Sequence, residues 1–124
     1  MKLSKEDKKE MKVWLKALRS GKYKQAKNSL QNAYGYCCLG VACDILIPDK
    51  KLKYEKDIKF LVGGLPEDQP ASPEWLNVIA EVKFNIPEKN RKIYLSELND
   101  HIGYSFSQIA DLVEDTFLKG DTHE

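Results

Sequence analysis

Small and apolar residues fill the stretch from 36 to 47, which carries no Lys, Arg or Glu. Within it, Leu39, Cys43 and Leu46 or Ile47 recur at the three- and four-residue spacing of one helical face. The stretch therefore predicts a buried helix around which the rest of the chain packs.

Two amphipathic helices are predicted near the ends of the chain. The first begins after Ser4, which can cap it with Asp7 in its first turn, and it stops before Gly21. The second begins after Ser105, which can form a capping box with Gln108. The apolar stripes of the two helices are Met11, Trp14, Leu15 and Leu18 in the first, and Phe106, Ile109, Leu112, Val113 and Phe117 in the second.

The segments in between predict shorter elements. We expect a short helix over 23–30, a turn over 32–35, and one or two short strands within 52–62. A proline-containing loop then leads to Ser72, which caps a helix with Pro73 at its first position. This helix continues to about Lys83, and the charged run 88–92 closes the segment. The pattern as a whole predicts a single α+β domain over 1–124, mostly helical with a small two- or three-stranded sheet and a frayed tail at 119–124.

Composition fits this interpretation. The chain has 124 residues, of which 42% are apolar and 31% are charged, as expected for one folded domain. No run approaches the ~18 apolar residues of a membrane span, and the first residues lack the apolar stretch of a secretion signal. Three cysteines, two of them adjacent, do not predict a disulfide framework. We therefore expect a cytoplasmic protein without a membrane partner.

Charge is divided unevenly along the chain. Residues 1–60 hold 15 Lys and Arg against 7 Asp and Glu, whereas residues 61–124 hold 5 against 12. The two halves attract each other, and the basic half can also offer a site to an anion. The first helix and the loop after it carry the basic residues Lys8, Lys12, Lys16, Arg19, Lys22, Lys24 and Lys27. A solvated helix face explains such lysines, unless several of them converge on one spot.

The start of the central helix is a candidate site. Tyr36, Cys37 and Cys38 lie where unpaired backbone N–H groups and the helix dipole favour a thiolate or a phosphate. The alternative is that these cysteines are small buried hydrophobic residues.

Several motifs resemble those of a group of small uncharacterised proteins met in bacteriophages and prophages. The resemblance rests on YCCLGV at 36–41, LSELND at 95–100, and Gly103 followed by SF and IADLVE within 105–114. With the segment 18–23, Leu65-Pro66 and Trp75, it covers most of the chain. It implies a phage-type accessory protein inside a bacterial host cell. Such proteins counter host defences by binding a host protein or by sequestering a nucleotide signal. It assigns no activity to particular residues.

An enzymatic alternative uses a cysteine nucleophile. Cys37 or Cys38 would attack, His101 would act as the base, and Asn99 or Asp100 would orient the imidazole. The three cysteines and His101 could also supply four zinc ligands, but adjacent cysteines chelate a metal poorly. We expect no metal, and no cofactor motif such as a phosphate loop is present.

A DNA-binding alternative rests on the helix, glycine turn, helix outline of residues 95–113. A recognition helix that meets phosphates should carry Lys or Arg, whereas this one offers Asp111, Glu114 and Asp115. We therefore expect no DNA partner.

The remaining interpretation is binding without chemistry. A nucleotide-like anion needs donors for its phosphates, an aromatic face for its base and polar groups for its edges. We expect this binding rather than catalysis, with a host protein as the alternative partner and a homo-oligomer as a further possibility. The expected ligand-binding residues are Arg19, Lys22, Lys24, Lys27, Tyr34, Tyr36, Cys38, Trp75, Asn99 and Asp100.

Overall fold

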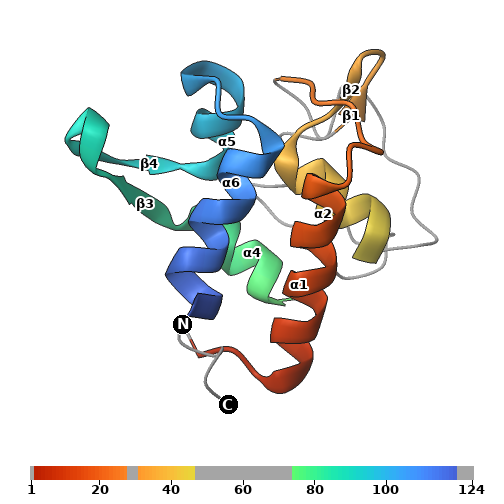
Figure 1. The fold of residues 1–124 in the computed structure, drawn as a ribbon, viewed down its shortest axis with the longest axis vertical. Coiled ribbons are helices and arrows are strands. Elements are labelled where there is room, and N and C mark those ends of the chain that lie inside the picture. The colour runs from red at the N-terminus through yellow and green to blue at the C-terminus, as the bar shows by residue number, and fades with distance from the viewer. Residues whose placement is uncertain (1, 28–30, 47–73, 120–124) are drawn as a thin grey trace.

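The computed structural model describes residues 2–27, 31–46 and 74–119 (Figure 1). Its α-helices are α1 (Lys5–Arg19), α2 (Cys38–Leu46), α4 (Glu74–Glu81), α5 (Leu95–Glu97) and α6 (Phe106–Val113). Its strands are β1 (Gln31–Asn32), β2 (Gly35–Tyr36), β3 (Lys83–Ile86) and β4 (Arg91–Tyr94). The 3₁₀ turn η1 (Pro87–Lys89) joins β3 to β4, and the π-helical turns η2 (Leu98–Ile102) and η3 (Glu114–Leu118) continue α5 and α6.

α1 has the bounds that its sequence predicts, because both ends carry the expected signals. The Asp7 N–H donates to Ser4 Oγ at 3.0 Å, and the Ser4 N–H donates to Asp7 Oδ2 at 3.1 Å. At the other end Gly21 takes a left-handed φ of 79°, which ends the helix. The predicted apolar stripe of α1 is buried.

α2 lies at the centre of the core, as predicted. Residues 38–43 are all buried. The Trp14 indole Nε1–H of α1 donates to the Cys38 carbonyl oxygen at 2.9 Å, and the ring of Trp75 from α4 lies 5.8 Å from that of Trp14. One apolar centre therefore joins α1, α2 and α4.

The predicted helix over 23–30 is wrong for residues 23–27. Their backbone groups bond to β2 instead: the Ala26 N–H donates to the Tyr36 carbonyl at 2.7 Å, and the Tyr36 N–H donates to the Lys24 carbonyl at 2.8 Å. Gly35 allows this close approach, because a Cβ there would lie 2.1 Å from the Lys24 carbonyl oxygen. The predicted turn at 32–35 is confirmed as the connection of the β1–β2 hairpin.

A second antiparallel hairpin, β3–β4, was not predicted. Phe84 pairs with Ile93 and Ile86 pairs with Arg91, so three apolar side chains reach the core while Lys83 and Asn85 are exposed. The helix expected to reach Lys83 ends at Glu81, and the charged run 88–92 is the turn and the start of the return strand. The ring of Phe84 contacts that of Phe117 edge-on, which fixes the hairpin to η3.

The C-terminal helices follow the prediction closely. Gly103, with a φ of 86°, separates η2 from α6. Ser105 and Gln108 form the expected capping box, since each side chain bonds to the backbone N–H of the other residue. Phe106, Ile109 and Val113 are buried, whereas Leu112 and Phe117 are half-buried at the edge of the core.

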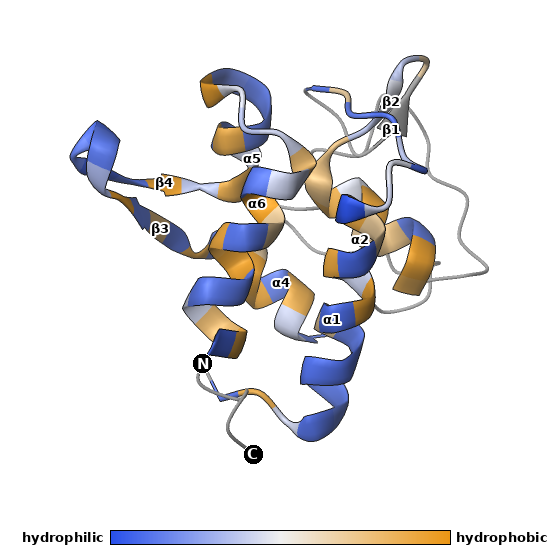
Figure 2. Cartoon of the chain, viewed as in Figure 1, coloured by the Kyte–Doolittle hydropathy of each residue, from blue (hydrophilic) through white to orange (hydrophobic). Residues whose placement is uncertain are grey.

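The fold is therefore a mostly helical α+β arrangement with two small antiparallel hairpins, which confirms the predicted fold class. Much of α1 is hydrophilic along the ribbon (Figure 2), whereas its apolar stripe is buried. The strands predicted within 52–62, the cap at Ser72 and the tail beyond Lys119 lie outside the described residues.

Candidate functional site

The start of α2 is closed rather than open to a ligand. The Cys38 N–H donates to Asn99 Oδ1 at 3.2 Å, and the Gly40 N–H faces Cys37 Sγ at 3.4 Å. The Val41 N–H donates to the Cys37 carbonyl oxygen. The expectation of bare amides at this helix start is therefore wrong, because buried side-chain and backbone acceptors already satisfy these N–H groups.

Asn99 is the acceptor that closes this helix start, and all its hydrogen-bonding positions are used. Its side-chain oxygen also accepts from Gln25 Nε2 at 2.9 Å, and its Nδ2 donates to the Ala26 carbonyl at 2.7 Å and to Asp100 Oδ1 at 2.8 Å. Only 1% of Asn99 is exposed. The residue expected to read a ligand instead joins η2 to α2 and to the segment before the first hairpin.

The three cysteines lie in the buried core of the described structure. None of the three is in a disulfide, all three are buried, and Cys38 has no exposed surface. Burial, followed by the charges of Cys37 and Asp100, raises the pKa of the Cys38 thiol well above its ordinary value. The expected stabilisation of a thiolate is therefore wrong for Cys38. His101 is exposed on η2, and no hydrogen bond between it and a cysteine is present among the described residues.

The other predicted ligand-binding residues are dispersed. Trp75 is 2% exposed and its Nε1–H donates to Glu10 Oε1 at 2.9 Å, so its ring is part of the core and offers no face to a base. Tyr36 is half-buried, with its ring edge-on to that of Tyr23. Tyr34 is 78% exposed at the tip of the first hairpin. Lys22, Lys24 and Lys27 are exposed in the loop that follows α1.

Arg19 has partners within the protein. Its guanidinium donates to Asp111 Oδ1 at 2.7 Å and to Glu114 Oε1 at 2.5 Å. This pair of contacts links the end of α1 to α6 and η3. Two carboxylates therefore face the single positive charge of Arg19.

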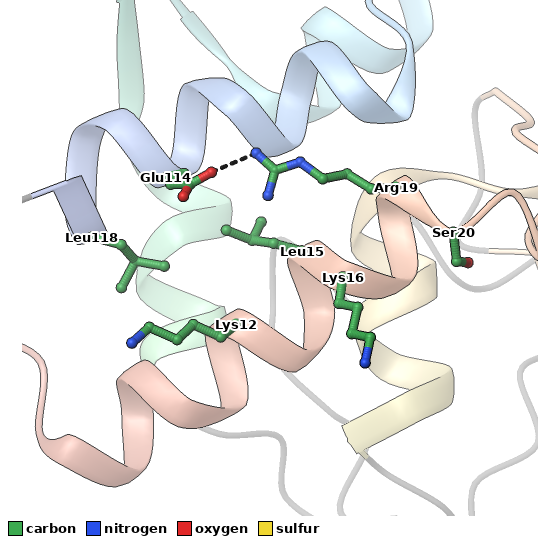
Figure 3. A pocket seen from close by; sticks show the side chains of 7 residues that line it. All are labelled: Lys12, Leu15, Lys16, Arg19, Ser20, Glu114 and Leu118. Carbon is green, nitrogen blue, oxygen red and sulfur yellow. Dashed lines mark hydrogen bonds and ion pairs between the residues drawn. The ribbon is translucent and has the colours of Figure 1, made fainter. Parts of the chain in front are cut away.

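A groove lies between α1 and the C-terminal helix (Figure 3). Its volume is about 510 Å³. Leu15 and Leu118 lie between the two helices, Arg19 reaches across to Glu114, and Lys12 and Lys16 extend from α1. Ser20 completes the lining. The groove therefore combines an aliphatic floor with two lysines on one rim.

The outer face of α1 carries a lysine stripe, which we define as Lys5, Lys9, Lys12 and Lys16. Their spacing of four, three and four residues places all four on one side of the helix, and all four are exposed. The structure records no ion pair or hydrogen bond for their ammonium groups within the described ranges. Sequence reasoning singled out Lys12 and Lys16 but missed Lys5 and Lys9, although the spacing itself was the signal.

The described residues carry little that would support other chemistry. They contain no cluster of three or more His, Cys, Asp or Glu placed to hold a metal ion. None of the helices described is both long enough and apolar enough to cross a membrane. The exposed side of α6 and η3 has acidic residues and no Lys or Arg before Lys119.

Comparison with known proteins gives a family but no activity. No curated protein and no solved structure matches the chain. The family model of DUF8296, a domain of unknown function, matches residues 6–117, which include every described element except the first residue of α1 and the last of η3. The chain therefore belongs to the DUF8296 family.

Proposed function

We propose that this protein acts by binding, without catalysing a reaction, and that its partner is an acidic protein surface docked along the lysine stripe of α1. The observation that carries the proposal is the set of four exposed ammonium groups on one helical face, none of them paired within the described chain. Like charges at this spacing repel one another by about 0.2–0.5 kcal/mol per pair. A partner that brings carboxylates to the stripe would remove this repulsion.

The length of the stripe suits a helix or an extended segment. From Lys5 to Lys16 a helix rises about 17 Å. An acidic helix of similar length can place glutamates at the same spacing, so that each lysine meets one carboxylate. Such exposed pairs are individually weak, and their main effects are on orientation and on the association rate.

The surroundings of the stripe favour a protein over a nucleic acid or a nucleotide. Among the residues that the structure describes, no aromatic ring lines the groove on which a base could stack. The nucleotide site expected at the start of α2 also lacks support, because its amides are already bonded.

We further propose that the partner is a protein of a bacterial host cell, with this protein in the cytoplasm of that cell. The support is the resemblance of the sequence to small phage proteins. An inhibitor of a host defence or regulatory protein is the function that fits such a binding surface.

The test is a titration with two synthetic helical peptides of about 12 residues, one with glutamates at the spacing of the stripe and one with glutamines in their place. The variant Lys9→Glu/Lys12→Glu/Lys16→Glu reverses the charge of three of the four lysines in the stripe. The matched control, Lys83→Glu/Lys89→Glu/Lys92→Glu, changes the net charge equally on the exposed side of the β3–β4 hairpin.

We expect the glutamate peptide to bind the wild-type protein and the hairpin variant, and to bind the stripe variant at least about tenfold more weakly. Circular dichroism checks that each variant is folded. Equal weakening in the two variants would mean that only net charge matters, and tighter binding of a duplex DNA or a mononucleotide than of the peptide would also contradict the proposal.

A further inference from the structure

The groove between α1 and the C-terminal helix has two unlike walls. On the wall of α6 and η3, Asp111 and Glu114 are held by Arg19. On the wall of α1, Lys12 and Lys16 have no partner among the described residues. An incoming carboxylate therefore finds unmatched positive charge on the α1 side alone, which fixes the side from which an acidic ligand approaches.

The interior of the groove is aliphatic. Leu15 and Leu118 close its floor, and both are almost completely covered. Lys12 and Lys16 both line the groove from α1, and their side chains extend in different directions, Lys12 toward the side of Leu118 and Lys16 away from Glu114 (Figure 3). Lysine stems offer apolar surface while the charged ends stay in water. A side chain that enters the groove thus meets carbon below and positive charge at the rim.

We propose that this groove takes an apolar side chain of the acidic partner segment, whose flanking carboxylates lie on Lys12 and Lys16. This inference rests on the proposed function and names the recognition element within it. The volume of about 510 Å³ falls within the range of about 300–1,000 Å³ that is typical of sites for small ligands, so a leucine-sized group fits with room for its neighbours. The partner is then an amphipathic acidic segment rather than a uniformly charged one, as in other helix-in-groove complexes.

The stripe and the groove are adjacent, which makes the two contacts compatible. Lys12 and Lys16 belong to both, so one helical segment lying along α1 can place its carboxylates on the stripe and one side chain in the groove. Charge would then align the segment, and the apolar contact would fix its register.

The experiment uses the glutamate peptide in two forms, with leucine or alanine at the position that faces the groove. Both are titrated into the wild-type protein and into two variants. Leu118→Ala shortens a side chain on the groove floor. Val113→Ala is the matched control, because Val113 is equally buried on the same helical run but does not line the groove.

We expect the leucine peptide to bind the wild-type protein about tenfold more tightly than the alanine peptide. This preference should persist in Val113→Ala and fall to about twofold or less in Leu118→Ala. The absolute affinities of the variants are less important than this ratio, because a partly unfolded variant binds both peptides less well.

Other results would overturn the inference in distinguishable ways. Equal binding of both peptides, with the dependence on the lysine stripe retained, would refute the groove contact and leave the proposed function standing. Failure of both peptides to bind would contradict both proposals. Sedimentation could also show that the wild-type protein is a dimer. If Leu118→Ala dissociates this dimer and Val113→Ala does not, the groove binds a second copy of this chain instead of an acidic segment.

Discussion

Asn99 shows how a polar residue can define a core. It is almost fully buried, and its four hydrogen bonds reach Gln25, Ala26, Cys38 and Asp100. A buried polar group costs free energy unless it is bonded, and here every donor and acceptor of the amide has a partner. The residue therefore specifies the relative placement of three segments that are far apart in the sequence.

We predict that Asn99→Ala lowers the free energy of unfolding by about 2–4 kcal/mol, because it leaves the Cys38 N–H and the Ala26 carbonyl buried without partners. Urea denaturation measures the change. Asn85→Ala is the control, since Asn85 is exposed on β3 and should change stability by no more than about 0.5 kcal/mol. Equal losses in the two variants would contradict the role given to Asn99.

The burial of Cys38 predicts how the stability of the protein depends on pH. Its folded-state pKa is raised, chiefly by burial, above the ordinary value of 9.0. The unfolded chain therefore releases this proton first, so the stabilisation is complete below that value and is lost as the pH rises through it toward the folded pKa.

The free energy of unfolding should accordingly fall above about pH 9, with this thiol contributing up to about 1.4 kcal/mol per pH unit. Cys38→Ala should reduce that slope. Native-state alkylation of Cys38 by iodoacetamide, followed by mass spectrometry, should be slow at neutral pH. Rapid native-state labelling of this thiol would instead restore it as a candidate nucleophile.

At the residue scale, the sequence indicates which residues are important but does not indicate whether they bind a ligand or stabilise the core. The LSELND motif drew attention to Asn99 and Asp100, and the expected role was ligand binding. Three of the four bonding partners of Asn99, namely Gln25, Ala26 and Cys38, lie 61 to 74 residues away in the sequence, so no local pattern reveals them. Trp75 was misjudged for the same reason, because the core position of its ring depends on Trp14 and Glu10.

The helix caps carry the strongest local information. Both capping boxes, at Ser4 and at Ser105, define the first turn of a helix in the structure. These interactions involve residues only three positions apart, which is why sequence alone locates α1 and α6.

We predict that Ser105→Ala lowers the free energy of unfolding by about 1 kcal/mol through loss of the cap. Ser107→Ala is the matched control within the same helix, where alanine is the better helix former and stability should be unchanged or slightly raised. Thermal denaturation of both variants checks the difference, and the absence of one would show that the cap contributes nothing.

Segments whose structure depends on distant pairing were harder to predict. Lys83 to Ile86 alternates polar and apolar residues, but four residues are too few for a reliable strand signal next to a helix. Asn90, with a left-handed φ of 52°, closes the turn of this hairpin. Because charged residues surround it in the sequence, the segment was interpreted as a charged run and not as a turn. Residues 23–27 fail as a helix because their backbone bonds to β2, which local propensity cannot indicate.

At the scale of the whole molecule, the unequal charge of the two halves has two consequences. One is internal: Arg19 of the basic half bonds to Asp111 and Glu114 of the acidic half, as expected from their attraction. The other is external, because the lysine stripe on the adjacent face of α1 has no such counterpart in the described structure. The fold class was predictable from helix patterns, whereas the surface used for binding required the helices to be placed.

The proposed docking surface is most directly tested by an NMR titration of the ¹⁵N-labelled protein with the acidic leucine peptide. We predict that amide shifts concentrate along the exposed face of α1 and over η3, beside Leu118, and that β3–β4 is unaffected. Shifts confined to the β3–β4 hairpin or to the start of α2, with α1 unchanged, would contradict the account.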